Sequence, residues 1–196
     1  MRRVGSLVVV ALFIVVLGFS CGEEVVAPYS SQVTVLGDVA AWQVSCSGQC
    51  GAFSVFYRHY VTAVVTYANK TAPVSQVDEP MNDVELTWWA PSGDFWLRDD
   101  DFLPYYENGC YMCTGPDDPD CPECKDVLWP LEKPYDTETD ERGLSEIIWI
   151  LVFPPSFCYQ CGQDYPYSIF ADIGVARGSY QVTFSVASPE EEGGGG

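Results

Sequence analysis

The stretch Tyr180-Gln-Val-Thr-Phe-Ser-Val186 alternates apolar and polar side chains with a period of two, and the turn former Gly178 precedes it. Successive side chains of a β-strand point to opposite faces, so its apolar side chains share one face and its polar side chains the other. Strict alternation over this length predicts a half-buried strand. The stretch therefore places this part of the chain in a sheet that packs one face on a hydrophobic core.

Similar patterns recur along most of the chain. Ile147–Phe153 is continuously apolar and ends at two prolines, which suits a strand buried on both faces. Runs that alternate or are rich in residues of high β-propensity lie at 33–35, 42–46, 53–58, 60–67, 84–89, 94–97 and 169–175. These runs predict about eight or nine strands, with no helices to connect parallel strands. We therefore expect a mostly antiparallel β-sandwich over residues 32–188, immunoglobulin-like in the broad sense, with a closed barrel as the alternative.

The segment 99–143 interrupts this pattern. It holds fourteen acidic residues, three basic residues and four cysteines, and it has no apolar periodicity that could build a core. We expect it to be an insertion between two strands, ordered by covalent cross-links. The tail 189–196 is rich in Glu and Gly and predicts a flexible end.

Two groups of aspartates in this segment are candidate calcium ligands: Asp99, Asp100 and Asp101, and Asp117, Asp118 and Asp120. Calcium takes six to eight oxygen ligands, and an extracellular site can be weak. Neither group has the spacing of a helix–loop–helix calcium loop, and aspartate is also an ordinary turn residue. A weak calcium site and a simple turn role are both consistent with these residues.

The charge of the chain excludes one class of partner. It has 28 acidic and 9 basic residues, for a formal net charge of −19 at pH 7. Such a field repels nucleic acid and anionic lipid head groups. The sequence therefore predicts no nucleic-acid role, and solubility is the simplest explanation of the charge.

Nine cysteines are present, and eight of them form close pairs. The pairs are Cys46 and Cys50, Cys110 and Cys113, Cys121 and Cys124, and Cys158 and Cys161. An even number of paired cysteines in an exported chain is typical of a disulfide framework, although spacing alone does not fix the connectivity. We expect disulfides within or between neighbouring pairs.

A metal site is the alternative for these cysteines. Cys121-Pro-Glu-Cys124 and Cys158-Tyr-Gln-Cys161 each resemble the knuckle of a zinc ribbon, which implies tetrahedral zinc held by four thiolates. Redox catalysis is a third interpretation, but a reactive CxxC motif gains its low thiol pKa at a helix N-terminus, and no such element is predicted here.

The first twenty residues have the layout of an export signal. Arg2 and Arg3 precede the charge-free apolar run Val4–Phe19. At ~1.5 Å per residue this run is about 24 Å long as a helix, which is short for a hydrocarbon core of ~30 Å. We expect residues 1–20 to be a cleaved signal peptide, with an uncleaved signal anchor as the alternative.

The segment Leu17-Gly-Phe-Ser-Cys21 resembles the lipobox of bacterial lipoproteins. This resemblance covers only the targeting region and implies that Cys21 is lipidated and becomes the first residue, with 21–31 as an anchor and linker. The match departs from the usual pattern, because Leu17 lies four residues before the cysteine instead of three. Ordinary secretion without lipid is the alternative.

The sequence offers little support for catalysis. His59 is the sole histidine, and its place in a β-rich run predicts a surface strand residue. Adjacent Trp88 and Trp89 must face opposite sides of a sheet. Exposed aromatic side chains among acidic loops would suit recognition of a carbohydrate or protein partner, although a covered second face explains the same residues.

The sequence therefore predicts a non-catalytic protein of the cell envelope, exported and lipid-anchored to the membrane, with a binding or structural role. The alternative is a thiol-based protein of the envelope that binds zinc or carries out redox chemistry.

Overall fold

The structure is a computed structural model that describes residues 31–44, 55–67, 79–153, 158 and 160–187. The predicted signal peptide 1–20, Cys21 and most of the linker 21–31 lie outside the described residues. Cys46, Cys50 and the tail 189–196 also lie outside them.

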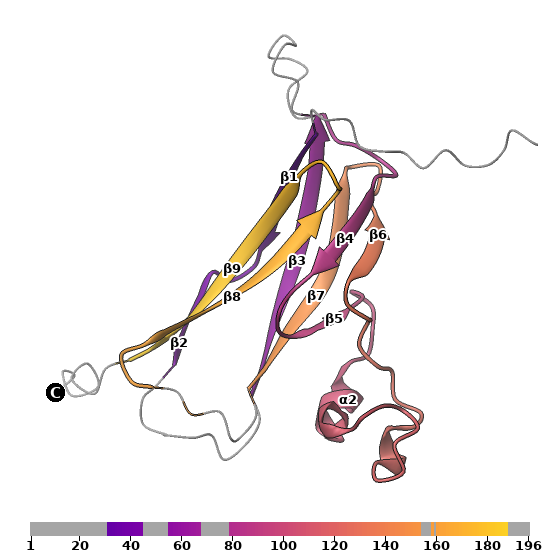
Figure 1. The fold of residues 1–196 in the computed structure, drawn as a ribbon, viewed down its shortest axis with the longest axis vertical. Helices are drawn as coiled ribbons and strands as arrows, with labels where there is room; N and C mark the ends of the chain where they lie inside the picture. The colour runs from indigo at the N-terminus through magenta and orange to yellow at the C-terminus, as the bar shows by residue number, and fades with distance from the viewer. Residues whose placement is uncertain (1–30, 45–54, 68–78, 154–157, 159, 188–196) are drawn as a thin grey trace, which may run out of the picture.

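In the described residues, nine strands form two sheets, and the two sheets face each other (Figure 1). The four-stranded sheet has the order β1 (Ser31–Gly37), β3 (Val55–Tyr67), β7 (Leu144–Phe153) and β5 (Asp94–Trp96). The five-stranded sheet has the order β2 (Ala41–Val44), β9 (Arg177–Val186), β8 (Asp164–Asp172), β4 (Glu85–Trp89) and β6 (Tyr135–Glu138). The predicted β-sandwich is confirmed. One pair, β2 with β9, is parallel, so the second sheet is mixed.

The main core lies between the two sheets. In β7, Ile147, Trp149 and Leu151 point inward and are almost fully buried, because side chains alternate along a strand. They pack with inward residues of the facing sheet, including Leu86 and Phe184. Burial of such large side chains is worth about 1.5–3 kcal/mol each, and this core is what holds the sandwich together.

The two adjacent tryptophans of β4 confirm the expected alternation. Trp88 is fully buried in the main core, and its indole N–H donates to the hydroxyl of Ser145 at 3.2 Å. Trp89 is 42% exposed on the outer face, where it packs edge-on against Phe170.

The predicted strands differ from the structure in three places. The described part of the run 53–58, from Val55 on, and the run 60–67 belong to one long strand, β3. β8 starts at Asp164 and ends at Asp172, earlier than the predicted 169–175. β6 was not expected, because its sequence Tyr-Asp-Thr-Glu carries no apolar pattern; it is an edge strand that pairs with β4 alone. The insertion therefore comprises residues 97–134, between β5 and β6, and not 99–143.

A sharp turn leads into this insertion. The predicted turn 90–93 connects β4 of one sheet to β5 of the other. Gly93 has a φ of +87°, which favours glycine, and a Cβ there would lie 2.4 Å from the indole nitrogen of Trp149. The turn thus brings the chain across the sandwich edge and onto the four-stranded sheet.

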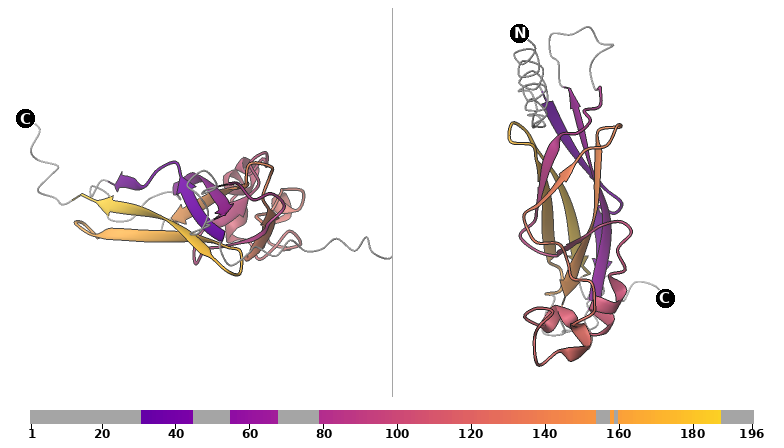
Figure 2. Two further views of the ribbon diagram at one scale, coloured as in Figure 1. Left: turned by 90° about the horizontal axis from the view of Figure 1, so that it is seen from above. Right: turned by 90° about the vertical axis from the view of Figure 1, so that its right-hand side faces the viewer.

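The insertion holds one short helix, α2 (Leu103–Glu107), and two 3-10 turns, η2 (Cys110–Met112) and η3 (Pro122–Cys124). It lies at one end of the sandwich, beside β5 and β7, in two perpendicular views (Figures 1 and 2). Across the stretches of chain described above, no helix has the length and apolar character needed to cross a membrane.

Candidate functional site

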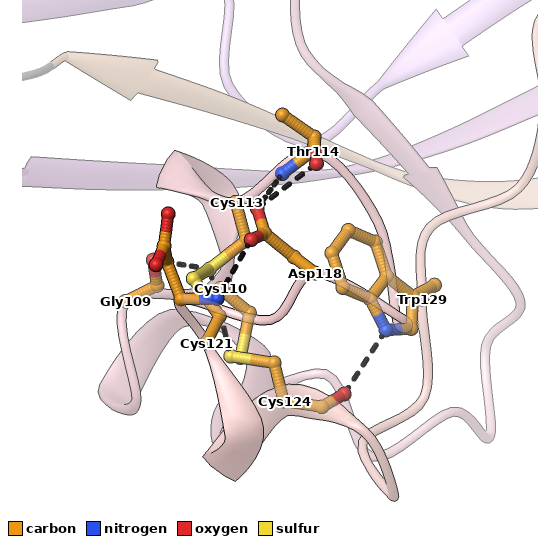
Figure 3. Close-up of a disulfide and its surroundings, with 9 residues drawn as sticks. Gly109, Cys110, Cys113, Thr114, Asp118, Cys121, Cys124 and Trp129 are labelled. Atoms are coloured by element: carbon orange, nitrogen blue, oxygen red, sulfur yellow. Dashed lines mark hydrogen bonds between the residues drawn. A yellow bond between two sulfur atoms is a disulfide. The ribbon is translucent and has the colours of Figure 1, made fainter.

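Two nested disulfides order the insertion. Cys110 bonds to Cys124, and Cys113 bonds to Cys121 inside that loop (Figure 3). Cys158 is also disulfide-bonded, as is Cys161. The prediction of disulfides between neighbouring pairs is confirmed for the four cysteines of the insertion. Zinc needs thiolates, and these four sulfurs are instead bonded in pairs.

Asp118 closes the inner loop through its carboxylate. It accepts hydrogen bonds from the backbone N–H and the hydroxyl of Thr114, at 2.8 and 2.9 Å, and from the N–H of Asp120 at 3.0 Å (Figure 3). These donors lower the pKa of Asp118, because they stabilise its charged form. The carboxylate of Asp100 also accepts a backbone hydrogen bond, from the N–H of Leu97 at 2.7 Å.

The structure thus gives two of the six candidate calcium ligands a turn role. Within the described parts of the chain, no three His, Cys, Asp or Glu side chains are grouped so that they could hold a metal ion.

The insertion packs on the outer face of the four-stranded sheet and forms a second hydrophobic cluster there. Its fully buried members include Trp96, Ile148 and Ile150 from the sheet and the disulfide Cys110–Cys124. Rings from the insertion pack in edge-on and tilted pairs with one another and with Trp96 of the sheet, such as Trp96 with Tyr105 at 5.4 Å between centroids. Such pairs add about 0.5–1.5 kcal/mol beyond burial. The predicted covered second face is therefore present where the insertion lies.

A cavity of about 370 Å³ lies where the insertion meets the sheet. Its lining consists of Gly93, Asp94, Tyr105, Tyr111, Met112 and Val152. Tyr105 is only 5% exposed, whereas Met112 is 73% exposed and lies at the surface. The cavity combines one carboxylate, two phenol rings and two apolar side chains.

A hydrogen-bond chain fixes the carboxylate of this cavity. The indole N–H of Trp96 donates to the hydroxyl of Tyr106 at 3.1 Å, and that hydroxyl donates to Oδ2 of Asp94 at 3.0 Å. Burial raises the pKa of Asp94, partly offset by the bond from Tyr106 and by the charge of Lys133. Burial, and then the charge of Asp94, raise the pKa of Tyr105 to about 12. The phenol of Tyr105 therefore stays neutral at ordinary pH.

A smaller cavity of about 100 Å³ lies on the same outer face, between β3 and β7. The ion pair of Arg98 and Glu146, at 2.8 Å, lines it. Glu146 also accepts a hydrogen bond from the hydroxyl of Thr62 at 3.4 Å. The charged groups of this cavity already pair with each other, so they are less available to a ligand than the carboxylate of the larger cavity.

The prediction that His59 is a surface residue was wrong. β3 is continuous, so His59 shares the inward face with Tyr57 and Val61 and is fully buried. Its Nδ1 lies 3.5 Å from Oδ1 of Asp38, yet neither ring nitrogen has a hydrogen bond. Burial lowers the pKa of His59, although Asp38 acts in the opposite direction. The alternation along β3 was the signal that could have placed it.

The residues that line the larger cavity were not predicted as a site. Asp94 was recognised only as the start of a predicted strand, and Tyr105 only as a residue of the acidic insertion. Their proximity depends on the fold of the insertion over the sheet, which the local pattern does not contain.

No protein-family model and no curated protein matches this chain. The chain is similar to a solved structure, the ASH / PapD-like domain of human CEP192 (PapD-like domain 7), with a TM-score of 0.31 and 9% identity. The match covers 85% of this chain and 91% of that chain.

Proposed function

We propose that this chain is an exported, lipid-anchored, non-catalytic protein of the cell envelope that binds a partner through the insertion. The observation that carries the proposal is the placement of the insertion relative to the start of the sandwich. β1 begins at Ser31, which pairs with Tyr67, the last residue of β3. At the opposite end of β3, Phe56 contacts Tyr106 and Tyr111 of the insertion.

The span of β3 separates these two ends. From Phe56 to Tyr67 it is roughly 36 Å long at about 3.3 Å per residue. A lipid on Cys21 would be connected to the sandwich at the Ser31 end. The insertion would then be held at the end of the sandwich far from the anchor, where a partner can reach it.

The disulfides support export, because such bonds form and persist outside the reducing cytosol. The alternative of a thiol-based zinc or redox protein would need thiolates, and no observation in the described residues favours it. The sole histidine of the chain is fully buried and lines neither of the two cavities described above.

Expression of the full chain in a bacterial host tests the targeting and the redox state together. We expect the mature chain to start at an acylated Cys21 and to resist thiol alkylation until it is reduced. A Cys21→Ser variant should be exported but released from the membrane fraction. A cytosolic product that retains Met1 and is alkylated without reduction would overturn the proposal.

A further inference from the structure

The larger cavity contains polar atoms that the fold does not satisfy. Oδ2 of Asp94 accepts the hydroxyl of Tyr106, but no hydrogen bond from the described residues reaches Oδ1. The hydroxyl of Tyr105 likewise has no hydrogen-bond partner among the described residues, although the residue as a whole is only 5% exposed. Neither atom belongs to the fully enclosed unpaired atoms of the described residues, so both are open to the cavity and available to a ligand.

The charge of this region favours a cation as that partner. The lining contains one carboxylate and no basic or amide side chain. The insertion itself has ten acidic residues and three basic ones. A partly buried carboxylate attracts a cation more strongly than an exposed one, because solvent screens it less.

The rest of the lining suits an organic cation better than a metal ion. The rings of Tyr105 and Tyr111 offer π faces, and a cation close to such a face gains about 0.5–2 kcal/mol. Met112 and Val152 provide apolar contact for a hydrocarbon stem. A cavity of about 370 Å³ also exceeds a bare ion, since a water molecule takes up about 30 Å³.

The hydrogen bonds favour an ammonium over a guanidinium. A guanidinium binds best to both oxygens of a carboxylate in a planar fork, but Tyr106 already occupies Oδ2. An ammonium is a compact group with three donors. Its donors suit the two separate acceptors of this lining, Oδ1 of Asp94 and the hydroxyl of Tyr105.

Lys133 does not fill this role. Its amine donates to the carbonyl oxygen of Gly93 and lies 5.8 Å from the ring centroid of Phe95. Lys133 and Asp94 form no ion pair among those of the described residues. Its charge is nevertheless close enough to weaken the attraction of the cavity for another cation.

We propose that the cavity between the insertion and the outer face of the four-stranded sheet binds an alkylammonium group, of the kind carried by a lysine side chain or a free diamine. Asp94 is the anionic group, Tyr105 provides the hydroxyl, and Tyr111 provides a ring face. This inference deepens the proposed binding role and depends on it only for its biological setting.

Calorimetric titration of the oxidised, purified chain tests the proposal. The probes are the peptide acetyl-Gly-Lys-Gly-amide, 1,5-diaminopentane, and a matched peptide with norleucine in place of lysine. We expect both ammonium probes to bind and the norleucine peptide to bind at least tenfold more weakly. Tighter binding of the peptide would indicate a protein partner, and tighter binding of the diamine a small molecule; either result supports the ammonium chemistry.

Variants then locate the binding. Asp94→Asn keeps the acceptor for Tyr106 and should weaken ammonium binding at least tenfold. The matched control Glu123→Gln removes one exposed charge elsewhere on the insertion and should change the affinity less than twofold. Lys133→Gln should strengthen binding.

A second variant, Tyr105→Phe, provides an independent test if Asp94→Asn does not fold. Tyr105→Phe loses one hydrogen bond and should weaken binding about three- to tenfold. Equal losses in Asp94→Asn and Glu123→Gln would show attraction to the general acidic field and would overturn the site. Absence of ammonium binding in a chain that is correctly exported and lipidated would refute this inference and leave the proposed function standing.

Discussion

Removal of the outer disulfide should open the insertion and leave the sandwich intact. The Cys110–Cys124 bond joins residues at a sequence separation of 14, and a closed loop of roughly 15 residues is worth about 3 kcal/mol in the chain-entropy account. Both sulfurs are fully buried, so truncation to alanine should cost about 1 kcal/mol more at each. The variant Cys110→Ala/Cys124→Ala should therefore destabilise the insertion by about 5 kcal/mol.

The matched control is Cys113→Ala/Cys121→Ala. Its bond has a sequence separation of 8, which corresponds to roughly 2.6 kcal/mol, and its sulfurs are only half-buried. The loss should therefore be smaller than for the outer pair.

Native-state hydrogen exchange measures both variants locally. The backbone N–H groups at positions 124 and 127, which bond to carbonyls within the insertion, should exchange at least a hundredfold faster in the outer variant. Amides of β3 and β7 should keep most of their protection, because the inward faces of both strands remain packed in the main core, whose buried residues include none from the insertion. An inner variant that opens the insertion as much as the outer one, or an equal loss of protection in the sandwich, would refute this reasoning.

Three further predictions concern the sandwich, and denaturant unfolding checks each. Burial lowers the folded-state pKa of His59 below 6.5, so the unfolded chain takes up the proton first and stability should fall as the pH drops below about 6.5, by at most about 1.4 kcal/mol per pH unit. Gly143→Ala should cost at least about 2 kcal/mol, because φ is +70° and the new Cβ would lie 2.6 Å from a main-chain oxygen of β3. Trp88→Ala should cost about 3–5 kcal/mol and Trp89→Ala about 1 kcal/mol or less.

Each of these predictions has its own control. The groups that face His59 are Asp38, Trp42 and Trp149, and the charge of Asp38 also raises the pKa of Tyr180. A His59→Leu variant should remove the pH dependence between pH 7 and 5, and its persistence would assign the effect to another group. An unchanged unfolding midpoint for Gly143→Ala would contradict the argument from the backbone at that position. Equal losses of unfolding free energy in Trp88→Ala and Trp89→Ala would contradict the argument from their burial.

The sandwich was predictable because its signal is local. The alternation of apolar and polar residues in β9 indicates a strand with one buried face. The continuous apolar run of β7 indicates a strand buried on both faces. The positions of Trp88 and Trp89 followed from the same rule. His59 was misplaced because a polar residue in a β-run was read by its type and not by its position in the alternation.

The cavity was not predictable for a different reason. Asp94 and Tyr105 become neighbours only after the turn at Gly93 crosses the sandwich and the insertion folds back on the sheet. No periodicity in the insertion records that contact, since its order comes from two disulfides and a cluster of rings. The disulfides themselves were expected, but their nested pairing could not be derived from spacing.

The two hydrophobic clusters lie on opposite faces of the same strands, and this arrangement sets the rule for transplanting the insertion. In β5, Phe95 belongs to the sandwich interior and Trp96 to the cluster under the insertion. A transplanted fragment of residues 97–134 alone would lack the sheet residues on which its aromatic rings pack. A workable graft must also carry Trp96, Ile148 and Ile150 onto the recipient, and any β-sheet with two adjacent antiparallel strands and room on its outer side could then display this acidic insertion.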